Sequence, residues 1–576
     1  MDWAVRTEEG RSRLALFALI AAMVAAAALL LWEGRNLTFF IDEWSFGYLA
    51  RHGMGASELL QPDNGHLAVV PVLATKVSLE LFGADTTLPL RIVSLALHLA
   101  ATGMLFVFLR SALGPLVALA PSILFLFLGA AGDAFVGSQS IPVQIAATSG
   151  VGALLALRSR SLFGDALAAV LLVVGVASNG FALPFVIGAA AVIVLEPRWR
   201  RSRLWVVALP VIVYAAWWLG YGHDAKSGFD IDNVGGLPAF GFDSLAAVLA
   251  ALTGLFTEHG VDRESFALGP GQAVAGAVLL AALVLAVRGY RPPRAALPAL
   301  LALLALWIAT GLVAGPARQP AASRYVYSSA LLLLIAAAPL IATVPGRRRA
   351  SIAVAVVCAI ALIPNLREIH YSGNFFRTQA SLNRAVLAAI DLTGPGAGAS
   401  MRIETADEQI PGGVDDMRDS IQDYRIGRES YGTPAYSGQE LAAADPGARE
   451  AADRLLARIL GIEVERARAP AMPLRRDFSV VPAKATVKRS RACVEMLPSA
   501  TGASATFELP PRGVRIRPAP GPTVPVALRR FGDSFSVDGG TVIGGVAADL
   551  RPRADPAAAG WQIQLPIQQR TLLCGV

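Results

Sequence analysis

The feature of this 576-residue chain that most limits its fold is a series of apolar runs, each about twenty residues long. A helix rises about 1.5 Å per residue, so such a run is long enough to cross the hydrocarbon layer of a bilayer. Hydrophobic residues make up 54% of the chain and charged residues 16%, whereas soluble domains carry about 25% charged residues. We therefore predict a polytopic α-helical membrane protein. Soluble, fibrous, disordered and small disulfide-framework classes are excluded.

The apolar runs predict about eleven transmembrane helices. Their approximate ranges are 14–32, 92–109, 113–131, 141–157, 165–178, 181–196, 204–221, 270–287, 295–314, 325–344 and 350–366. The fifth and sixth runs are separated by only Ser178, Asn179 and Gly180. They could form two tilted helices with a tight turn or one re-entrant pair.

Arginine clusters set the predicted orientation. With eleven crossings, every cluster that flanks a run falls on one side, which the positive-inside rule makes cytoplasmic. These clusters are Arg6, Arg11 and Arg13; Arg110; Arg158 and Arg160; Arg198, Arg200, Arg201 and Arg203; Arg288, Arg291 and Arg294; and Arg347 to Arg349. The loops on the other side, 33–91 and 222–269, are acidic or mixed. We expect a multi-pass protein of the cytoplasmic (inner) membrane, with its N-terminus inside and a retained first helix.

The chain changes character after the last apolar run, and three regions are predicted. Residues 1–366 form the membrane domain, 367–477 a helical and loop-rich linker, and 478–576 short β-like runs broken by Pro and Gly, typical of a small β-sandwich. Cys493 and Cys574 bracket the β region, and in an oxidising compartment they predict a disulfide. We therefore expect a C-terminal extracytoplasmic α+β or β-sandwich domain.

Motifs of soluble enzymes are absent from the sequence, including a P-loop, H-E-x-x-H, C-x-x-C and G-x-S-x-G. The predicted spans also contain few ionisable side chains, His98 being the main exception. Ion-driven transporters place such groups near the middle of the membrane, so this scarcity argues against an ion-driven carrier. His98 itself is better interpreted as a hydrogen-bonded packing residue than as a proton relay.

Polar residues gather instead just after the first span, where Asp42 and Glu43 follow Phe39-Phe40-Ile41 and precede Trp44. A carboxylate at the membrane surface could act as a general base toward a hydroxyl group or hold a divalent cation beside a phosphate. An exposed Asp-Glu pair that is merely solvated is the competing interpretation.

Further motifs follow along the chain. They are Asn64-Gly65-His66 with Pro71, Pro89-Leu90-Arg91 at the start of the second span, and Ser323-Arg324-Tyr325-Val326-Tyr327 at the outer end of the tenth. Together with Asp42-Glu43-Trp44, this pattern resembles the C-type (GT-C) integral membrane glycosyltransferases. The resemblance covers about residues 1–366. It is strongest to an actinobacterial branch related to protein O-mannosyltransferases and aminoarabinose transferases.

The resemblance implies a hexosyl- or pentosyltransferase that takes its sugar from a polyprenyl-phosphate donor on the non-cytoplasmic face. Asp42 would then be the general base, and Glu43 a second choice for the base or an orienting partner. Arg324 would contact the lipid phosphate. The other residues assigned to substrate binding are Tyr325, Tyr327, Asn64, His66 and Arg91. Alternatives remain open, because Arg324 could anchor the helix at the interface and Asn64-Gly65 is a common turn.

No cofactor is required by the sequence, and a divalent cation is left open. Glu258, His259, Asp262 and Glu264 could complete a cation site with Asp42. Asp230-Ile231-Asp232 mimics the D-x-D of nucleotide-sugar transferases, but no nucleotide-binding domain accompanies it. Trp561 could stack on a sugar, although a core tryptophan of the sandwich is the simpler interpretation.

Two other functions remain as alternatives to the enzyme. The chain could be a flippase or export component for lipid-linked saccharides without chemistry of its own, or a membrane-anchored scaffold that binds glycan. In each case the expected partners are the bilayer, a polyprenyl-phosphate sugar, and a glycan, lipid or protein acceptor, and no nucleic acid. Eleven spans exceed what anchoring needs, and the scarcity of charge in the spans disfavours a polar transport path.

Overall fold

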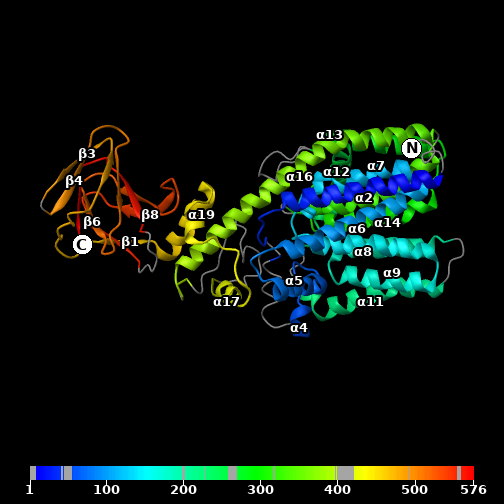
Figure 1. The fold of residues 1–576 in the computed structure, drawn as a ribbon, viewed down its shortest axis with the longest axis horizontal. Coiled ribbons are helices and arrows are strands. Elements are labelled where there is room, and N and C mark those ends of the chain that lie inside the picture. The colour runs from blue at the N-terminus through cyan, green and yellow to red at the C-terminus, as the bar shows by residue number, and fades with distance from the viewer. Residues whose placement is uncertain are drawn as a thin grey trace. The chain divides into compact units, whose positions relative to one another are not determined.

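The computed structural model of the chain divides into two compact units, Met1–Arg377 and Thr378–Val576, which are coloured by residue number in Figure 1. The residues that it describes are 8–40, 43, 55–196, 201–225, 228–256, 269–315, 318–344, 346–395, 397–398, 421–490, 492–553 and 560–576. Each unit is described by itself below.

Unit 1 is a bundle of apolar helices (Figure 1). Within the described ranges, nine helices are long and apolar enough to cross a membrane, which confirms the predicted membrane class. The longer helices are α2 (Glu8–Glu33), α6 (Leu88–Leu113), α8 (Ile141–Ala156), α11 (Trp205–Gly220), α12 (Asn233–Thr253), α13 (Gly269–Val287), α14 (Leu297–Leu312), α15 (Ser323–Thr343) and α16 (Arg347–Leu392). Three shorter apolar helices are α7 (Pro115–Leu126), α9 (Leu162–Val176) and α10 (Leu183–Val194).

Short elements complete unit 1 at the helix ends. The α-helices α4 (Ala56–Leu59) and α5 (Val69–Phe82) lie between α2 and α6. Short 3-10 helices are η1 (Gly129–Ala134), η2 (Leu157–Ser159), η3 (Gly180–Ala182), η4 (Arg201–Arg203), η5 (Gly222–Asp224) and η6 (Arg294–Ala296).

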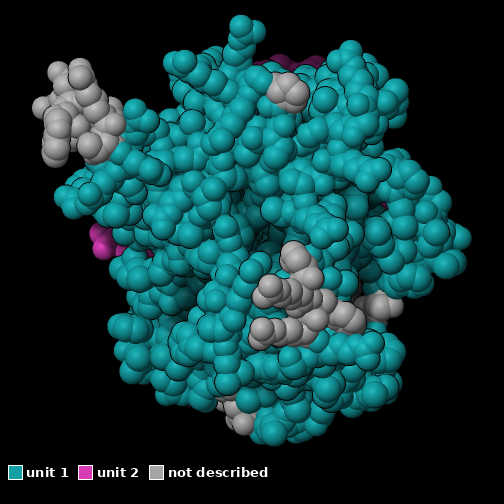
Figure 2. Space-filling view, turned by 90° about the vertical axis from the view of Figure 1, so that its right-hand side faces the viewer, with its two compact units in different colours: residues 1–377 teal, residues 378–576 magenta. Residues whose placement is uncertain are grey.

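Arginine-rich helix ends gather at one end of the bundle, which we call the arginine end. Arg347 donates to the Ala112 carbonyl (3.2 Å) and Arg158 to the Ser111 hydroxyl (3.1 Å), and Tyr290 bonds Thr343 (2.6 Å). This end faces the viewer in Figure 2. The sequence predicts that the arginine clusters share one side of the membrane, and that this side is cytoplasmic stays a prediction.

The opposite end, which we call the η1 end, is held together by main-chain contacts. Asn365 of α16 accepts from the Ala130 N–H (3.3 Å) and donates to the Ala251 carbonyl (2.9 Å). Ser323, the first residue of α15, donates to the Ala130 carbonyl (3.3 Å). The end of α12 and the start of α15 therefore meet η1.

Helix α12 lies where the sequence predicted only an outer loop, 222–269. Its first residue, Asn233, donates to the carbonyls of Leu312 (3.2 Å) and Ala314 (3.3 Å), between the end of α14 and the start of α15. Its last turn contacts Asn365. Both ends of α12 thus belong to the η1 end, and the helix leaves the order of crossings unchanged. Glycines and Pro238 interrupt the apolar pattern of its first half, which is why it reads as a loop.

The pair α9 and α10 forms the segment 165–196, for which the sequence left two tilted helices or a re-entrant pair open. Asp165 at the start of α9 and Glu196 beyond the end of α10 both bond Arg203, so both helix ends lie at the arginine end. The turn at Ser178 and Asn179 between them is fixed by Asn179, whose side chain accepts from the Phe181 N–H (3.0 Å). These segments are two separate helices joined by a tight turn.

Unit 2 begins within helix α16, which continues past the expected boundary at residue 366. Next come α17 (Ile421–Tyr431), α18 (Gly438–Ala442) and α19 (Pro446–Leu460). Eleven strands follow: β1 (Ile462–Arg466), β2 (Val481–Ala483), β3 (Ala485–Arg489), β4 (Cys493–Pro498), β5 (Ser504–Glu508), β6 (Val514–Pro518), β7 (Val524–Arg529), β8 (Val537–Val542), β9 (Ala548–Pro552), β10 (Gln562–Pro566) and β11 (Thr571–Gly575).

The strands form two antiparallel sheets, in the orders β1-β9-β6-β11-β4-β3 and β2-β5-β10-β7-β8, which confirms the expected C-terminal β domain. Strand β1 pairs with β9, so the β structure starts at Ile462, sixteen residues before the expected start at residue 478. Cys493 and Cys574 are opposite each other on β4 and β11 and form a disulfide. Trp561 is buried and donates to the Leu460 carbonyl (2.9 Å), as a core tryptophan would.

Candidate functional site

The candidate site at the η1 end begins with a tight turn that carries His66. The main-chain groups of Asp63 and His66 bond each other in both directions (2.9 and 2.8 Å). Asn64 and Gly65 between them have positive φ angles of 48° and 78°, the combination that a mirror-image hairpin turn requires and that Asn-Gly supplies most readily. The sequence of the turn therefore fixes the direction in which His66 leaves the chain.

Two contacts tie this turn to the bundle. The indole N–H of Trp217, near the end of α11, donates to the Leu60 carbonyl (2.8 Å). Beyond the turn, the Val70 N–H donates to the Ala177 carbonyl (3.2 Å) at the end of α9. Gly180 follows in η3, and a Cβ atom there would lie 3.0 Å from His66 Nδ1. His66 therefore packs directly against the α9–α10 turn.

The positive charges of two arginines act on His66. Burial, which is the largest cause, and the charges of Arg318 and Arg324 together lower the pKa of His66 to about 4. The imidazole is therefore neutral at physiological pH. Neutral imidazole offers one donor and one acceptor nitrogen beside the two guanidinium groups.

Arg318 lies in the loop before α15, and Arg324 lies in the first turn of this helix. The Arg324 guanidinium lies 5.1 Å from the Tyr325 ring, and Tyr325 in turn packs on Phe181 of η3 with ring centroids 5.5 Å apart. Arg318 donates to the Val313 carbonyl (3.4 Å). A side chain at Gly228 would collide with Arg318, so the glycine leaves the space that this guanidinium fills.

The cluster formed by His66, Arg318 and Arg324 is suited to an anion. Guanidinium groups bind phosphate and carboxylate oxygens with paired N–H donors. Two of them near a neutral histidine create a positive field at the end of an apolar bundle. We call these three residues the basic cluster.

Glu43 is a buried carboxylate whose two oxygens are both hydrogen-bonded, unlike those of a catalytic base. One carboxylate oxygen accepts from the Phe40 N–H (2.8 Å) and the other from the Ser138 hydroxyl. The side chain is buried, and its negative charge acts on Arg91. Both oxygens are therefore occupied, which suits the orienting role among the two that the sequence left open. Asp42, the predicted base, lies outside the described residues.

Arg91 and Tyr327 lie in the bundle rather than in the basic cluster. Arg91 donates to the carbonyls of Leu30 and Leu31 (3.1 Å each) and so holds the end of α2. Tyr327 is fully buried, and its hydroxyl lies 3.3 Å from His98 Nδ1. His98 also stacks on Phe135, with ring centroids 4.3 Å apart, as a packing residue does. Asn64 is an exposed turn residue.

Arg318 is the member of the cluster that the sequence analysis missed. It lies in the loop between α14 and α15, on the side that the positive-inside rule leaves poor in arginine. An arginine on that side, six positions before Arg324, is a usable signal. A cation that is not needed for topology is a candidate for ligand binding.

The residues proposed for a cation give no metal site in the structure. Glu258, His259, Asp262 and Glu264 lie outside the described residues, as does Asp42. The Asp230 carboxylate accepts from the Asp232 N–H (3.0 Å), a local turn at the start of α12. Within the described ranges, no three His, Cys, Asp or Glu side chains are grouped as metal ligands would be.

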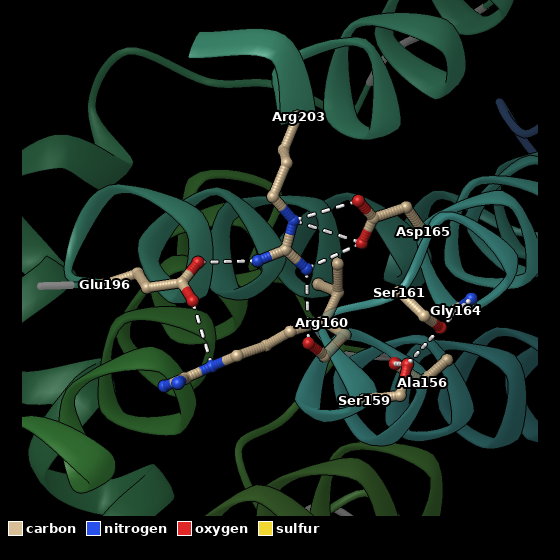
Figure 3. A network of polar contacts seen from close by, with 9 residues as sticks. Ala156, Ser159, Arg160, Ser161, Gly164, Asp165, Glu196 and Arg203 are labelled. Carbon is tan, nitrogen blue, oxygen red and sulfur yellow. Dashed lines mark hydrogen bonds and ion pairs between the residues drawn. The ribbon is translucent and has the colours of Figure 1, made fainter. Parts of the chain in front are cut away.

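A second polar network lies at the arginine end (Figure 3). Arg203 donates to both oxygens of Asp165 (2.6 to 3.1 Å), to Glu196 (2.6 Å) and to the Leu157 carbonyl (3.2 Å). Arg160 adds an ion pair to Glu196 (2.9 Å). Each carboxylate here has a cation, so the network links α9, α10 and α11 and leaves little demand for a ligand.

Fold and site together define a polytopic helical membrane protein with a basic cluster at one end of its bundle and a C-terminal β domain. No family model and no curated protein matches the chain. Among solved structures, the chain is similar to ArnT from Cupriavidus metallidurans bound to undecaprenyl phosphate. The identity is 13% and the TM-score 0.41, over 78% of this chain and 92% of that one. A TM-score this low gives no support to a shared function.

Proposed function

We propose that the chain is a glycosyltransferase of the cytoplasmic membrane that moves a sugar from a polyprenyl-phosphate donor to a cell-envelope acceptor on the outer face. The observation that carries this proposal is the basic cluster, because the positive charges of Arg318 and Arg324 act on His66 at the end of an apolar bundle. Contacts support this proximity, since Arg324 lies over Tyr325 and Tyr325 packs on Phe181, next to the glycine that adjoins His66. A polyprenyl phosphate has the matching chemistry, with an anionic head group on a hydrocarbon chain.

In the proposed reaction, the oxygen of the acceptor hydroxyl forms a bond to the anomeric carbon as the bond from that carbon to the phosphate oxygen breaks. The electron pair stays on the phosphate, where Arg318 and Arg324 stabilise the added charge. The hydroxyl proton passes to Asp42. Attack from the face opposite the phosphate inverts the anomeric centre.

Glu43 supports this reaction as a positioning residue. Its two oxygens bind the Phe40 main chain and Ser138, and these bonds hold Phe40 and Glu43, which lie on either side of the proposed base in the sequence. The topology inferred from the arginine clusters puts the N-terminus in the cytoplasm and the η1 end and the β domain outside.

The test is transfer from labelled decaprenyl-phosphate sugars in membranes that contain the full chain. We expect one sugar of the panel to be transferred, and Arg324→Gln, Arg318→Gln and Asp42→Asn each to abolish most of the transfer while protein levels in the membrane stay normal. Arg324→Lys is the matched control, since it keeps the charge and loses the paired donors. Movement of lipid-linked saccharide across the membrane without transfer would favour the flippase, and normal transfer by Arg324→Gln would refute the assignment.

A further inference from the structure

The β domain has a strongly basic face on its six-stranded sheet. Residues that are opposite each other in an antiparallel pair share one face of the sheet. The row Ala548, Ile516, Leu573 and Val494 is buried and forms the core side. The row Arg517, Leu572, Glu495 and Lys488 therefore belongs to the outer side.

Cations dominate this outer face. Arg517 and Lys488 are exposed, and no ion pair joins either to a carboxylate in the part of the chain that the structure describes. Glu495 between them is already paired with Arg570. The face thus keeps an excess of positive charge across four adjacent strands.

The segment before β2 carries further cations near the edge of this sheet. Arg489 of β3 donates to the carbonyls of Arg475 and Phe478 (2.9 Å each), which holds that segment beside the end of β3. Arg475 pairs with Asp477 (2.8 Å), and Arg476 is exposed without a carboxylate partner among the described residues. Over the whole range 465–490, the described side chains are exposed or half-buried and none is buried.

We propose that this basic face, defined by Lys488, Arg517 and Arg570, binds an acidic polysaccharide. The disulfide between Cys493 and Cys574 lies on the same sheet and indicates an oxidising compartment, where the polyanions are envelope polymers rather than nucleic acids. Lys488 and Arg517 are three strand spacings apart, about 14 Å. Charges spread this far over a flat sheet suit a linear polymer that makes many weak contacts.

This inference deepens the proposed function, because a bound polymer would be its acceptor or a primer for it. The experiment measures binding of polygalacturonate to the full chain in nanodiscs of zwitterionic lipid, with neutral dextran as the comparison. We expect polygalacturonate to bind, dextran to fail, and affinity to fall with added salt. Lys488→Glu with Arg517→Glu should weaken binding by about tenfold or more.

The matched control is Arg466→Glu with Arg512→Glu, an equal charge change at exposed positions away from the outer row, which should retain most of the affinity. Lys488→Gln with Arg517→Gln should give an intermediate loss and guards against misfolding of the double reversal. Equal binding of dextran, equal losses in both double reversals, or displacement of the polymer by anionic phosphatidylglycerol vesicles would overturn the proposal. Arg324→Gln should keep polymer binding while losing sugar transfer, so the two proposals can fail separately.

Discussion

The two ends of the helix bundle use arginine in opposite ways. At the arginine end, Arg203 is surrounded by Asp165, Glu196 and a main-chain carbonyl (Figure 3). At the η1 end, the positive charges of Arg318 and Arg324 act on a neutral histidine. Carboxylates surround the first arginine, whereas the other two create a positive field around His66, which we propose binds the phosphate of a lipid. The difference separates an arginine that holds helices together from arginines that are proposed to bind a ligand.

The largest effect should come from removing the compensated charge. Arg203→Ala leaves Asp165 and Glu196 without their main cation, and we expect a loss of about 3–5 kcal/mol in the free energy of unfolding. Thermal unfolding in detergent measures it. Arg160→Ala is the control, because Arg160 is exposed and, within the described ranges, pairs with Glu196 alone among the carboxylates; a similar loss in that variant would contradict the distinction.

The next effect concerns the η1 end. Arg324→Gln should lower kcat for sugar transfer by about 10²–10³-fold, the usual cost of removing one group that stabilises charge in the transition state. Its unfolding temperature should change little, in contrast to Arg203→Ala. Steady-state rates and unfolding curves on the same preparation check both halves, and a variant that unfolds early with a normal rate per folded molecule would reverse the comparison.

A smaller effect should appear as a pH dependence. The pKa of His66 is lowered to about 4 in the folded protein, against about 6.5 when unfolded. Between these values the unfolded state binds more protons, so stability is complete above pH 6.5 and falls toward pH 4, by up to about 3 kcal/mol. His66→Gln should flatten this part of the stability curve, and identical curves for variant and parent would exclude His66 as the source.

The smallest effect should follow from loosening the turn that carries His66. Trp217→Phe removes the hydrogen bond to the Leu60 carbonyl and should cost about 1 kcal/mol. Because His66 would then be held less firmly, we expect KM for the donor to rise more than kcat falls. Trp218→Phe is the control, since Trp218 is exposed and its indole N–H donates no hydrogen bond within the described ranges.

Much of the membrane fold follows from sequence because a bilayer imposes one rule on every span. The apolar runs place ten of the eleven predicted helices to within a few residues, but α16 continues to Leu392, well past its predicted end at residue 366. The prediction of a loop at 222–269 is wrong, because this range contains helix α12. The Gly-rich first half of α12 hides its helical pattern, and both of its ends lie at the η1 end. Hydropathy measures how long and how apolar a segment is, but not the direction in which a helix runs.

The site is predictable only in part. Arg324 and His66 stand out through their motifs, but their proximity arises from the packing of the Asp63–His66 turn on Gly180, which no spacing encodes. In the β domain, alternating apolar residues mark short strands such as β5, β7 and β10 in the sequence. Strands β1 and β3 instead carry charged residues at exposed positions, and their pairing partners decide their state.

The position of strand β11 in its sheet affects how the protein folds during synthesis. It follows every other strand in the sequence, yet it lies in the middle of its sheet, between β6 and β4. Until residues 571–575 have been synthesised and delivered, β1-β9-β6 and β4-β3 are two separate ribbons with open edges. Assembly of this sheet is therefore a late event in biogenesis, and removal of these few residues would leave two halves that other chains could invade.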